Sequence, residues 1–320
     1  MTWRPALFAI LTACGATNDP WDDPNYLLGS SVLDRALDLG QTPRGAHDEA
    51  VLCVSTSGWG VDMRCRTFAH SVSTFDLHET KGGLLLFVGL NLRRWGHDRV
   101  SLGHAYALTT PDLERFGSRI WEVRDTKLPF LTDLALEDLP DGRRRMVYVS
   151  GGADAPGVHT VRAALGRGDD WREAEPALYA DEGLLDPSAC SAGGTYHLFA
   201  TKHHAIVHAT GTDPWHYAED PAFSWIGAQV PSCFDDAGTL TVVAQAGGGW
   251  GAPVLRTLDK DGGFSAPRPL WEPGRYPDLA SCTSPVLRRF REQYVLICAV
   301  SRLSQAPQET QLPDGVAPTE

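Results

Sequence analysis

The sequence lacks any stretch that is long and apolar enough to cross a bilayer as a helix. It also lacks an excess of basic residues, with 28 Lys and Arg against 40 Asp and Glu and a formal net charge of −12. An acidic surface disfavours non-specific binding to nucleic acid or to anionic lipid. No GxxxxGK[ST] loop, no Rossmann glycine fingerprint and no GxSxG nucleophile elbow is present. These absences argue against helical membrane proteins, nucleic-acid binders and nucleotide-dependent enzymes.

The chain is rich in turn-forming residues. Its 320 residues include 32 Gly and 22 Pro, and 42% of them are apolar. No long helical pattern of apolar residues is sustained, so the composition favours many short strands joined by turns. A chain of this length can form one large all-β domain.

The amino terminus resembles a bacterial lipoprotein signal over residues 1–14. Arg4 precedes an apolar run, and Leu11-Thr12-Ala13-Cys14 resembles a lipobox, which predicts a lipid on Cys14. A polar tether with a short helix at Ser30–Gly40 is expected over residues 15–47. Gly15 after the cysteine points to the outer rather than the inner membrane. The alternative is an ordinary apolar first strand.

Six further cysteines fit an exported protein, because an even number is compatible with disulfides in an oxidising compartment. Cys53 and Cys65 lie symmetrically about one turn, and Cys282 and Cys298 about another, so each pair is expected to bridge its own hairpin. Cys190 and Cys233 would then join neighbouring repeats. Reduced, buried cysteines are the alternative.

One type of hairpin recurs five times, as a strand, a polar turn and an aromatic-aliphatic strand. Four of the turns carry Gly-Gly, Asp-Gly or Ala-Gly, which hairpins favour for positive φ. The copies begin at Ser71, Leu131, Leu184, Gln229 and Cys282.

A second type of hairpin follows each of the first four copies, and its aromatics are expected to pack between repeats. After the fifth copy it is missing, and the chain ends in a polar stretch, 304–320, expected to be disordered. The missing copy occurs instead at Ala50–Phe68. The sequence thus predicts an all-β, five-bladed β-propeller over 48–303, whose last blade is closed by amino-terminal strands. The predicted blades are 71–124, 128–179, 182–226, 228–272, and 280–303 completed by 48–68. A β-sandwich of unrelated hairpins is the alternative.

The inner strand of each blade lines the central channel of such a ring, so residues at the strand starts meet any ligand. The comparable positions are Ser73 or Val72, Asp133, Asp186, Val230 and Ser284. Two neighbouring blades thus each offer a carboxylate. The alternative is that both aspartates are structural and bond to backbone groups.

The segment LLDPSACSAGGTYHLFAT, with its Asp186-Pro187-Ser188 start, resembles the blade signature of five-bladed glycoside hydrolases of family 43 and their relatives. LTDLALEDLPDGRRRMVYVS resembles a weaker copy. The resemblance implies that Asp133 and Asp186 match the base and the orienting aspartate of that family. The next blade has Gln229-Val230-Pro231, with no glutamate for the acid, and Glu182 would substitute only if it turned inward.

Loops expected on the same face add candidate ligand-binding side chains. Aromatic rings stack on sugars, and polar groups bond to hydroxyls. The candidates are Trp95, Trp250, Arg94, Lys202, His203 and His204. No spaced His/Cys set predicts a metal site, and no cofactor is expected, although the sequence leaves open whether an ion fills the channel.

Two functions are consistent with these features. The first is an exported, lipid-anchored monomer that recognises a glycan, with a glycosidase-like site whose hydrolytic activity the sequence does not decide. The second is a non-catalytic surface scaffold that binds a protein partner. In both, the membrane is reached only through the lipid and no nucleic acid is bound.

Overall fold

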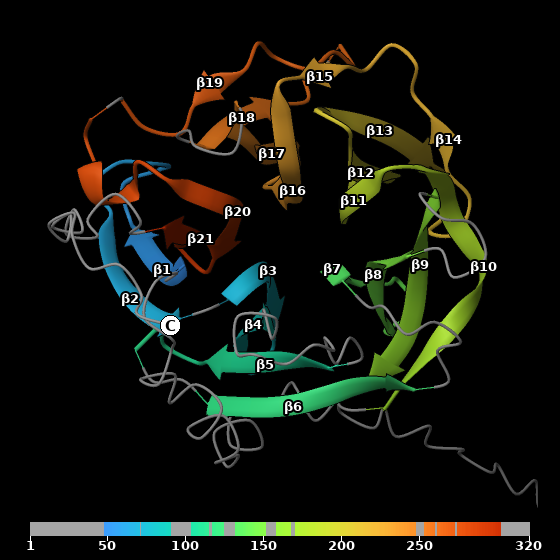
Figure 1. The fold of residues 1–320 in the computed structure, drawn as a ribbon, viewed down its shortest axis with the longest axis horizontal. Coiled ribbons are helices and arrows are strands. Elements are labelled where there is room, and N and C mark those ends of the chain that lie inside the picture. Colours follow the sequence, from blue (N-terminus) through green and yellow to red (C-terminus); the bar gives the residue numbers. More distant parts are fainter. Residues whose placement is uncertain are drawn as a thin grey trace, which may run out of the picture.

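The computed structural model describes residues 48–70, 72–90, 104–114, 117–124, 132–151, 158–167, 170–247, 253–259, 261–272 and 274–301. Its strands surround a central axis in a β-propeller arrangement (Figure 1). The predicted all-β propeller fold is therefore confirmed. The predicted signal segment with Cys14, the tether, the short helix and the carboxyl-terminal tail lie outside the described residues. Within those residues, no helix has the length and apolar character needed to cross a membrane.

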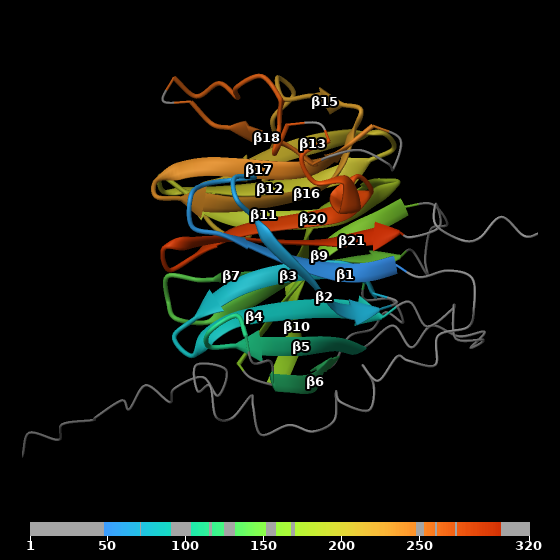
Figure 2. The same cartoon turned by 90° about the vertical axis from the view of Figure 1, so that its left-hand side faces the viewer.

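The first and last strands of the described chain lie side by side (Figure 2). β1 (Asp48–Ser55) pairs antiparallel along its whole length with β21 (Gln293–Ser301), from Asp48↔Ser301 to Ser55↔Tyr294. β2 (Arg64–His70) and β20 (Cys282–Phe290) complete a sheet of order β2-β1-β21-β20. Hydrogen bonds from β1 thus occupy an edge of β21 that would otherwise be open to another chain. The predicted closure by amino-terminal strands is confirmed.

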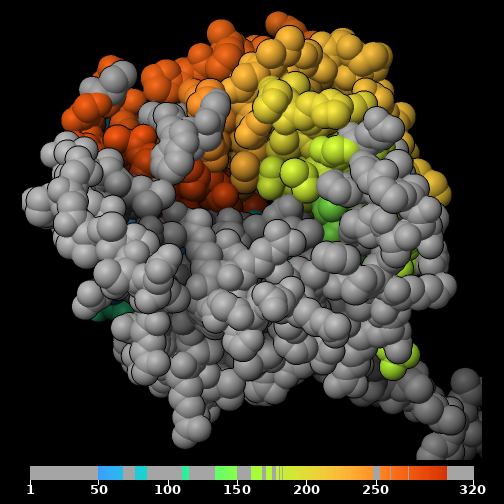
Figure 3. Space-filling view, viewed as in Figure 1, coloured from blue at the N-terminus to red at the C-terminus, as the bar shows by residue number. Residues whose placement is uncertain are grey.

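Two further sheets are built from consecutive strands. The first contains β11 (Leu184–Ala192), β12 (Thr195–Lys202), β13 (Ala205–Gly211), β14 (Ala218–Glu219) and β15 (Trp225–Ile226). The second contains β16 (Ala228–Asp236), β17 (Thr239–Ala246), β18 (Pro253–Thr257) and β19 (Arg268–Pro269). A short 3-10 helix, η3 (Pro277–Leu279), precedes β20. In the space-filling view, residues of these sheets and of β20 form one continuous arc (Figure 3).

The remaining strands form one eight-stranded sheet made of two antiparallel meanders. One meander is β3 (Val72–Thr80), β4 (Gly83–Leu90), β5 (His104–Thr110) and β6 (Gly117–Arg124). The other is β7 (Thr132–Asp138), β8 (Arg144–Gly151), β9 (Val158–Arg167) and β10 (Asp170–Glu182). Backbone pairing joins them where β6 and β10 run parallel, between Asp170↔Glu122 and Arg172↔Arg124. Their inner strands β3 and β7 are also in contact, through a hydrogen bond from the Leu136 amide to the Asp76 side chain.

Two of the turns between the first two strands of a unit carry glycine at a position with positive φ, as tight hairpins favour. Gly193 and Gly194 both have positive φ, of 59° and 82°, in the two-residue turn between β11 and β12. Ala237 and Gly238 do the same between β16 and β17, with φ of 53° and 90°. This backbone matches the twist of the strands it connects, which is why these turns close without splaying them.

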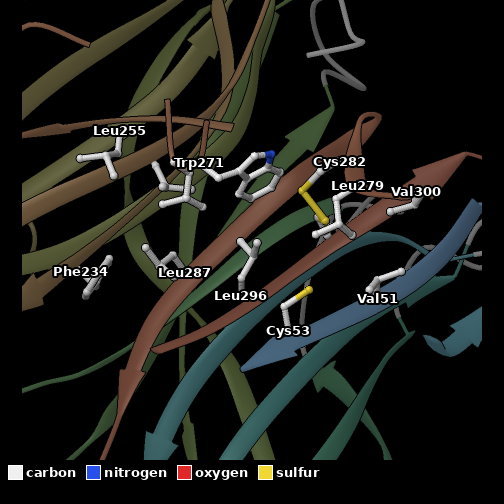
Figure 4. Close-up of a cluster of buried hydrophobic side chains, with 13 residues drawn as sticks. Val51, Cys53, Phe234, Leu255, Trp271, Leu279, Cys282, Leu287, Leu296 and Val300 are labelled. Atoms are coloured by element: carbon white, nitrogen blue, oxygen red, sulfur yellow. A yellow bond between two sulfur atoms is a disulfide. The ribbon is translucent and has the colours of Figure 1, made fainter. Parts of the chain in front are cut away.

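The core lies between neighbouring sheets. One cluster of buried side chains joins the closing sheet to the sheet of β16–β19 (Figure 4) and includes Leu287, Leu296 and Trp271. A second joins the sheets of β11–β15 and β16–β19 through Phe199, Phe223 and their neighbours. Burying one such aliphatic or aromatic side chain is worth about 1.5–3 kcal/mol, so these interfaces hold the ring together.

The aromatics expected to pack between repeats contact this core. Trp171 is fully buried, Phe264 packs against the cluster of Phe199, and Trp59 packs against that of Trp271. Trp215 packs against the cluster formed by β8, β9, β11 and β12. Phe116 lies outside the described residues.

Three disulfides are present, with the pairing that the hairpin geometry predicts. Cys53–Cys65 links β1 to β2, and Cys282–Cys298 links β20 to β21, with Cα atoms 4.0 and 5.4 Å apart. Cys190–Cys233 joins β11 to β16 of the neighbouring sheet across 5.9 Å. The alternative of reduced cysteines is thereby excluded for these six residues.

Candidate functional site

A β-bulge interrupts each of the inner strands β7, β11, β16 and β20 near its start. The register with the second strand shifts after Thr132, Leu185, Gln229 and Thr283, so two residues on the inner strand face one on its partner. In three units the first extra residue has positive φ: Asp186 (51°), Val230 (51°) and Ser284 (49°). Each is followed by a proline, which has no N–H to contribute to the ladder.

Side chains of the preceding sheet accept hydrogen bonds from the backbone amides of two of these bulges. The amide of Val230 donates to Thr201 Oγ1 at 2.8 Å, and the amide of Ser284 donates to Gln245 Oε1 at 3.2 Å. Positive φ is sterically costly for a residue with a Cβ, most of all for a β-branched one such as Val230. The neighbouring sheet therefore helps to hold a backbone conformation that the inner strand would not adopt by itself.

The bulges line a pocket together with Asp76 of β3. The strands that contribute to it, β3, β7, β11, β16 and β20, lie nearest the central axis of the ring (Figure 1). The empty volume of the pocket is about 390 Å³, which includes space open to solvent. It is lined by Asp76, Leu134, Ala135, Asp186, Pro187, Ser188, Val230, Pro231, Ser232, Ser284, Pro285 and Val286. The lining includes three prolines, one from each of β11, β16 and β20, and its polar side chains are carboxylates and hydroxyls.

A buried ion pair lies at the wall formed by the first and last inner strands. Arg288 of β20 donates from Nη2 to Asp76 Oδ1 of β3 at 2.7 Å and from Nη1 to Ser232 Oγ of β16 at 2.7 Å. The second oxygen of Asp76 accepts the Leu136 amide of β7 at 2.6 Å. These bonds connect four inner strands beside the pocket.

The electrostatics of this pair are those of two charges removed from water. Burial raises the pKa of Asp76, and this effect is opposed by Arg288 and by the Leu136 amide; burial also lowers the pKa of Arg288. Both Asp76 oxygens accept hydrogen bonds, which is the geometry of a carboxylate rather than of a protonated acid. Asp76 is therefore held in place and is not arranged to give a proton to a ligand.

The disulfide that joins two sheets lies next to the pocket. Ser188, a pocket residue, accepts the amide of Cys233 at 2.9 Å through its Oγ, and this oxygen lies 3.6 Å from the Cys233 sulfur. Cys233 is in turn bonded to Cys190, two residues beyond Ser188 on β11. This part of the pocket wall is covalently fixed.

Of the three carboxylates expected at the site, Asp186 is placed in the pocket. Asp133 occupies the bulge of β7, and Glu182 is the last residue of β10 rather than part of a loop; their side chains lie outside the described part of the structure. Whether the three converge therefore stays a prediction.

The basic candidates lie around the turn between β12 and β13. Lys202 forms an ion pair with Asp181, and His204 Nδ1 lies 3.0 Å from Gln229 Nε2, which also donates to the His203 carbonyl at 3.2 Å. None of the three is among the residues that line the pocket around Asp186. Arg94, Trp95 and Trp250 lie outside the described residues.

Sequence reasoning missed Asp76, Arg288 and the pocket hydroxyls of Ser188 and Ser232. The sequence did contain a signal for the charged pair. Asp76 lies in the inner strand of the first hairpin repeat (STFDLH), and Arg288 lies in the inner strand of the last repeat (PVLRRF), where most residues are apolar. Two opposite charges on strands that a ring brings together predict a pair.

Within the described chain, no group of three His, Cys, Asp or Glu side chains is arranged to hold a metal ion. The polar groups of the pocket are hydroxyls and carboxylates, which form hydrogen bonds to polar ligands such as hydroxyl compounds. The site is therefore suited to binding a small neutral polar molecule or the end of a longer one.

No protein-family model matches the chain, and no curated protein matches it in sequence. Solved structures do share its fold, which is that of a β-propeller. A thermostable family-43 glycoside hydrolase superposes with a TM-score of 0.54 and 9% identity over 72% of this chain and 88% of its own. A family-43 enzyme from Xanthomonas citri complexed with xylotriose gives 0.50 and 12%, over 72% and 86%.

A third similar structure is a family-43 β-xylosidase/α-arabinofuranosidase from a compost microbial metagenome, in complex with xylotriose and calcium-free. It gives a TM-score of 0.50 and 10% identity over 72% of this chain and 90% of its own. At such identities, the likeness establishes a shared fold. The fold that the chain shares with these structures is the β-propeller.

Proposed function

We propose that this chain is a carbohydrate-recognising β-propeller that binds a sugar in the pocket on its axis. The observation that carries the proposal is the pocket itself, in which Asp186 and the hydroxyl-bearing residues Ser188, Ser232 and Ser284 line the same space as three prolines. Carboxylates and hydroxyls bond to sugar hydroxyls, and ligand sites combine such groups with apolar surface. The shared fold with enzymes crystallised with xylotriose supports this choice of ligand class.

The same pocket argues against ordinary hydrolysis. Cleavage of a glycosidic bond normally needs one carboxylic acid and one carboxylate on opposite sides of that bond. Asp186 and Asp133 are proposed as the orienting group and the base, but the corresponding position of the next inner strand is Val230, and Asp76 is held by Arg288. We therefore expect binding to exceed any sugar release, unless Glu182 reaches the pocket.

The blade count and the location of the protein belong to the same proposal. The eight-stranded sheet is interpreted as two blades, because the strand pairing between its described halves is the short parallel one of β6 with β10. This division gives five blades. Export with a lipid on Cys14, towards the outer membrane, is supported by the amino-terminal pattern and by three disulfides, which form in oxidising compartments.

The test is a panel of plant and bacterial glycans, assayed for both binding and release of sugar. Asp186→Asn should weaken binding of the responding glycan by about tenfold or more, since it removes a charged acceptor worth about 1.5–3 kcal/mol. Asp261→Asn, at an exposed turn outside the pocket, is the matched control and should bind like the unchanged protein. Melting temperatures of both variants exclude a folding defect.

The possible outcomes separate the functions. Binding without release that depends on Asp186 supports the proposal as stated. Rapid release would contradict the expected lack of an acid. No response to any glycan would contradict carbohydrate recognition and favour the alternative, a scaffold for a protein partner.

A further inference from the structure

Two serines occupy the same place in neighbouring inner strands, beside the pocket. Ser188 of β11 and Ser232 of β16 are each the first residue after the bulge that pairs with the second strand. Both line the pocket, and they are only 2% and 3% exposed. The corresponding residues of β7 and β20 are Ala135 and Val286, which have no hydroxyl. At this level of the pocket wall, hydroxyls therefore come from β11 and β16.

The oxygen of Ser232 is committed as an acceptor. Arg288 Nη1 lies 2.7 Å from Ser232 Oγ, and a guanidinium group can only donate, so the serine oxygen must accept. Arg288 is held in this position by Asp76, whose Oδ1 accepts its Nη2 at 2.7 Å. The buried ion pair thus determines which part of the Ser232 hydroxyl is used inside the protein.

The proton of Ser232 is left over. A serine hydroxyl has one proton to donate in addition to its acceptor sites. Within the part of the chain that the structure describes, this proton has no acceptor, although an unpaired buried donor is unfavourable. Ser55 is equally buried, at 3% exposure, but its hydroxyl donates to the Val61 carbonyl and accepts the Ser57 amide at 3.2 Å. Ser232 is therefore a buried donor whose remaining partner must come from the pocket that it lines.

Ser188 differs from Ser232 in the surroundings of its proton. Its Oγ accepts the Cys233 amide at 2.9 Å and lies 3.6 Å from the Cys233 sulfur. Sulfur is a weak acceptor, so the Ser188 proton has a partner, though a poor one, inside the protein. Of the two equivalent serines, Ser232 is the one whose structure calls for a ligand.

We propose that Ser232 donates a hydrogen bond to a hydroxyl oxygen of a neutral sugar in the pocket, an inference that rests on the proposed carbohydrate recognition. A sugar hydroxyl accepts such a bond, whereas a charged amine has only donors and leaves Ser232 unpaired. Asp186 lines the same pocket, and its carboxylate accepts from another hydroxyl of the same sugar. The pocket therefore selects a ligand that offers an acceptor oxygen to β16 and a donor hydroxyl to β11.

The contact is tested by calorimetric titration of the whole protein with the methyl glycosides of xylose, arabinose, galactose, glucose and mannose. Ser232→Ala should weaken binding of the responding glycoside by about three- to tenfold, as expected for one neutral hydrogen bond. The variant should fold, because Arg288 Nη1 still donates to the Leu287 carbonyl at 2.8 Å. Ser55→Ala is the matched control, since it removes an equally buried hydroxyl that does not line the pocket, and it should leave the affinity unchanged.

Analogues of the responding glycoside test the same contact from the side of the ligand. Each monodeoxy form lacks one hydroxyl, and one of these forms should bind the unchanged protein more weakly than its parent while Ser232→Ala barely distinguishes the two. Such non-additivity identifies the oxygen that accepts from Ser232. Equal losses in both proteins for every deoxy form, or an unchanged affinity in Ser232→Ala, overturn the inference and leave carbohydrate recognition standing. Absence of binding by all the methyl glycosides also overturns it, and the glycan panel then decides the proposed function separately.

Discussion

Nη2 of Arg288 lies 2.7 Å from Oδ1 of Asp76, although 212 residues separate the two positions in the chain. The pair joins the last inner strand to the first, next to the point where β1 closes the ring by pairing with β21. Both side chains are almost fully buried. The ring is thus closed near the channel by the ion pair between Arg288 and Asp76, and further out by the backbone hydrogen bonds between β1 and β21.

Removing one partner of this pair should destabilise the protein strongly. Arg288→Met leaves the Asp76 carboxylate buried beside the pocket without its cation, which typically costs about 3–5 kcal/mol. Urea denaturation measures the loss. The double variant Arg288→Met/Asp76→Leu should lose less than the sum of its single variants, because it leaves no unpaired charge. Additive losses would show that the two side chains act independently.

The second prediction concerns two imidazoles between the sheets of β11–β15 and β16–β19. His197 Nδ1 lies 3.0 Å from His208 Nε2, and His208 Nδ1 lies 3.1 Å from Asp220 Oδ2. Burial, and then the charge of His208, lower the pKa of His197 from 6.5 to about 4; burial also lowers the pKa of His208, against the opposing effect of Asp220. The folded protein therefore holds both rings neutral at neutral pH.

Acid should therefore weaken the fold, because the unfolded chain binds protons on these histidines that the folded protein resists. The unfolded chain takes up protons on these histidines near pH 6.5, whereas folded His197 resists them until about pH 4. The free energy of unfolding should fall by up to about 3 kcal/mol over this range for His197. His197→Phe should flatten the pH dependence, while His216→Gln, at an exposed site, should leave it intact. Denaturant curves recorded between these pH values provide the measurement.

Much of the fold could be predicted because short stretches of sequence, such as turn residues and hairpin repeats, determine it. Gly193-Gly194 specifies a tight turn through backbone sterics alone, and the displaced hairpin at Ala50–Phe68 specifies closure because a ring must satisfy its edge strands. The disulfide pairing followed from the symmetry of Cys53 and Cys65 about their turn.

The site was harder to predict, because its parts come from five strands that only the finished ring brings together. Asp186 was recognisable from its own motif. Asp76 and Arg288 each look like an isolated charge in an apolar strand, and their meaning depends on the contact between them. The bulges at Val230 and Ser284 were also hidden, since their positive φ is supported by Thr201 and Gln245 of neighbouring sheets rather than by a local glycine.

The three disulfides should contribute unequally to stability. Cys190 and Cys233 are 43 residues apart and join two sheets, whereas Cys53 and Cys65 are 12 apart within one hairpin. The entropy of the unfolded chain predicts losses of about 4 and about 3 kcal/mol when each pair is replaced by alanine. Thermal and urea unfolding of the two double variants compare these values. A larger loss for the Cys53–Cys65 pair would contradict the entropic ordering.

Val230 offers a position where the native residue works against the fold. Its φ of +51° is unfavourable for a β-branched side chain, whereas asparagine tolerates this region through its short polar side chain. Because Val230 is only partly buried at the pocket, Val230→Asn should raise the free energy of unfolding by about 1 kcal/mol. Val254→Asn is the control, since Val254 is also partly buried but lies in regular strand β18, and it should destabilise the protein. The urea midpoints of the two variants should therefore shift in opposite directions. A loss of stability in Val230→Asn would mean that packing of the valine side chain stabilises the protein by more than the positive-φ backbone conformation destabilises it. Sugar binding measured on the same variant shows whether the strained residue at the pocket is kept for its contact with the ligand.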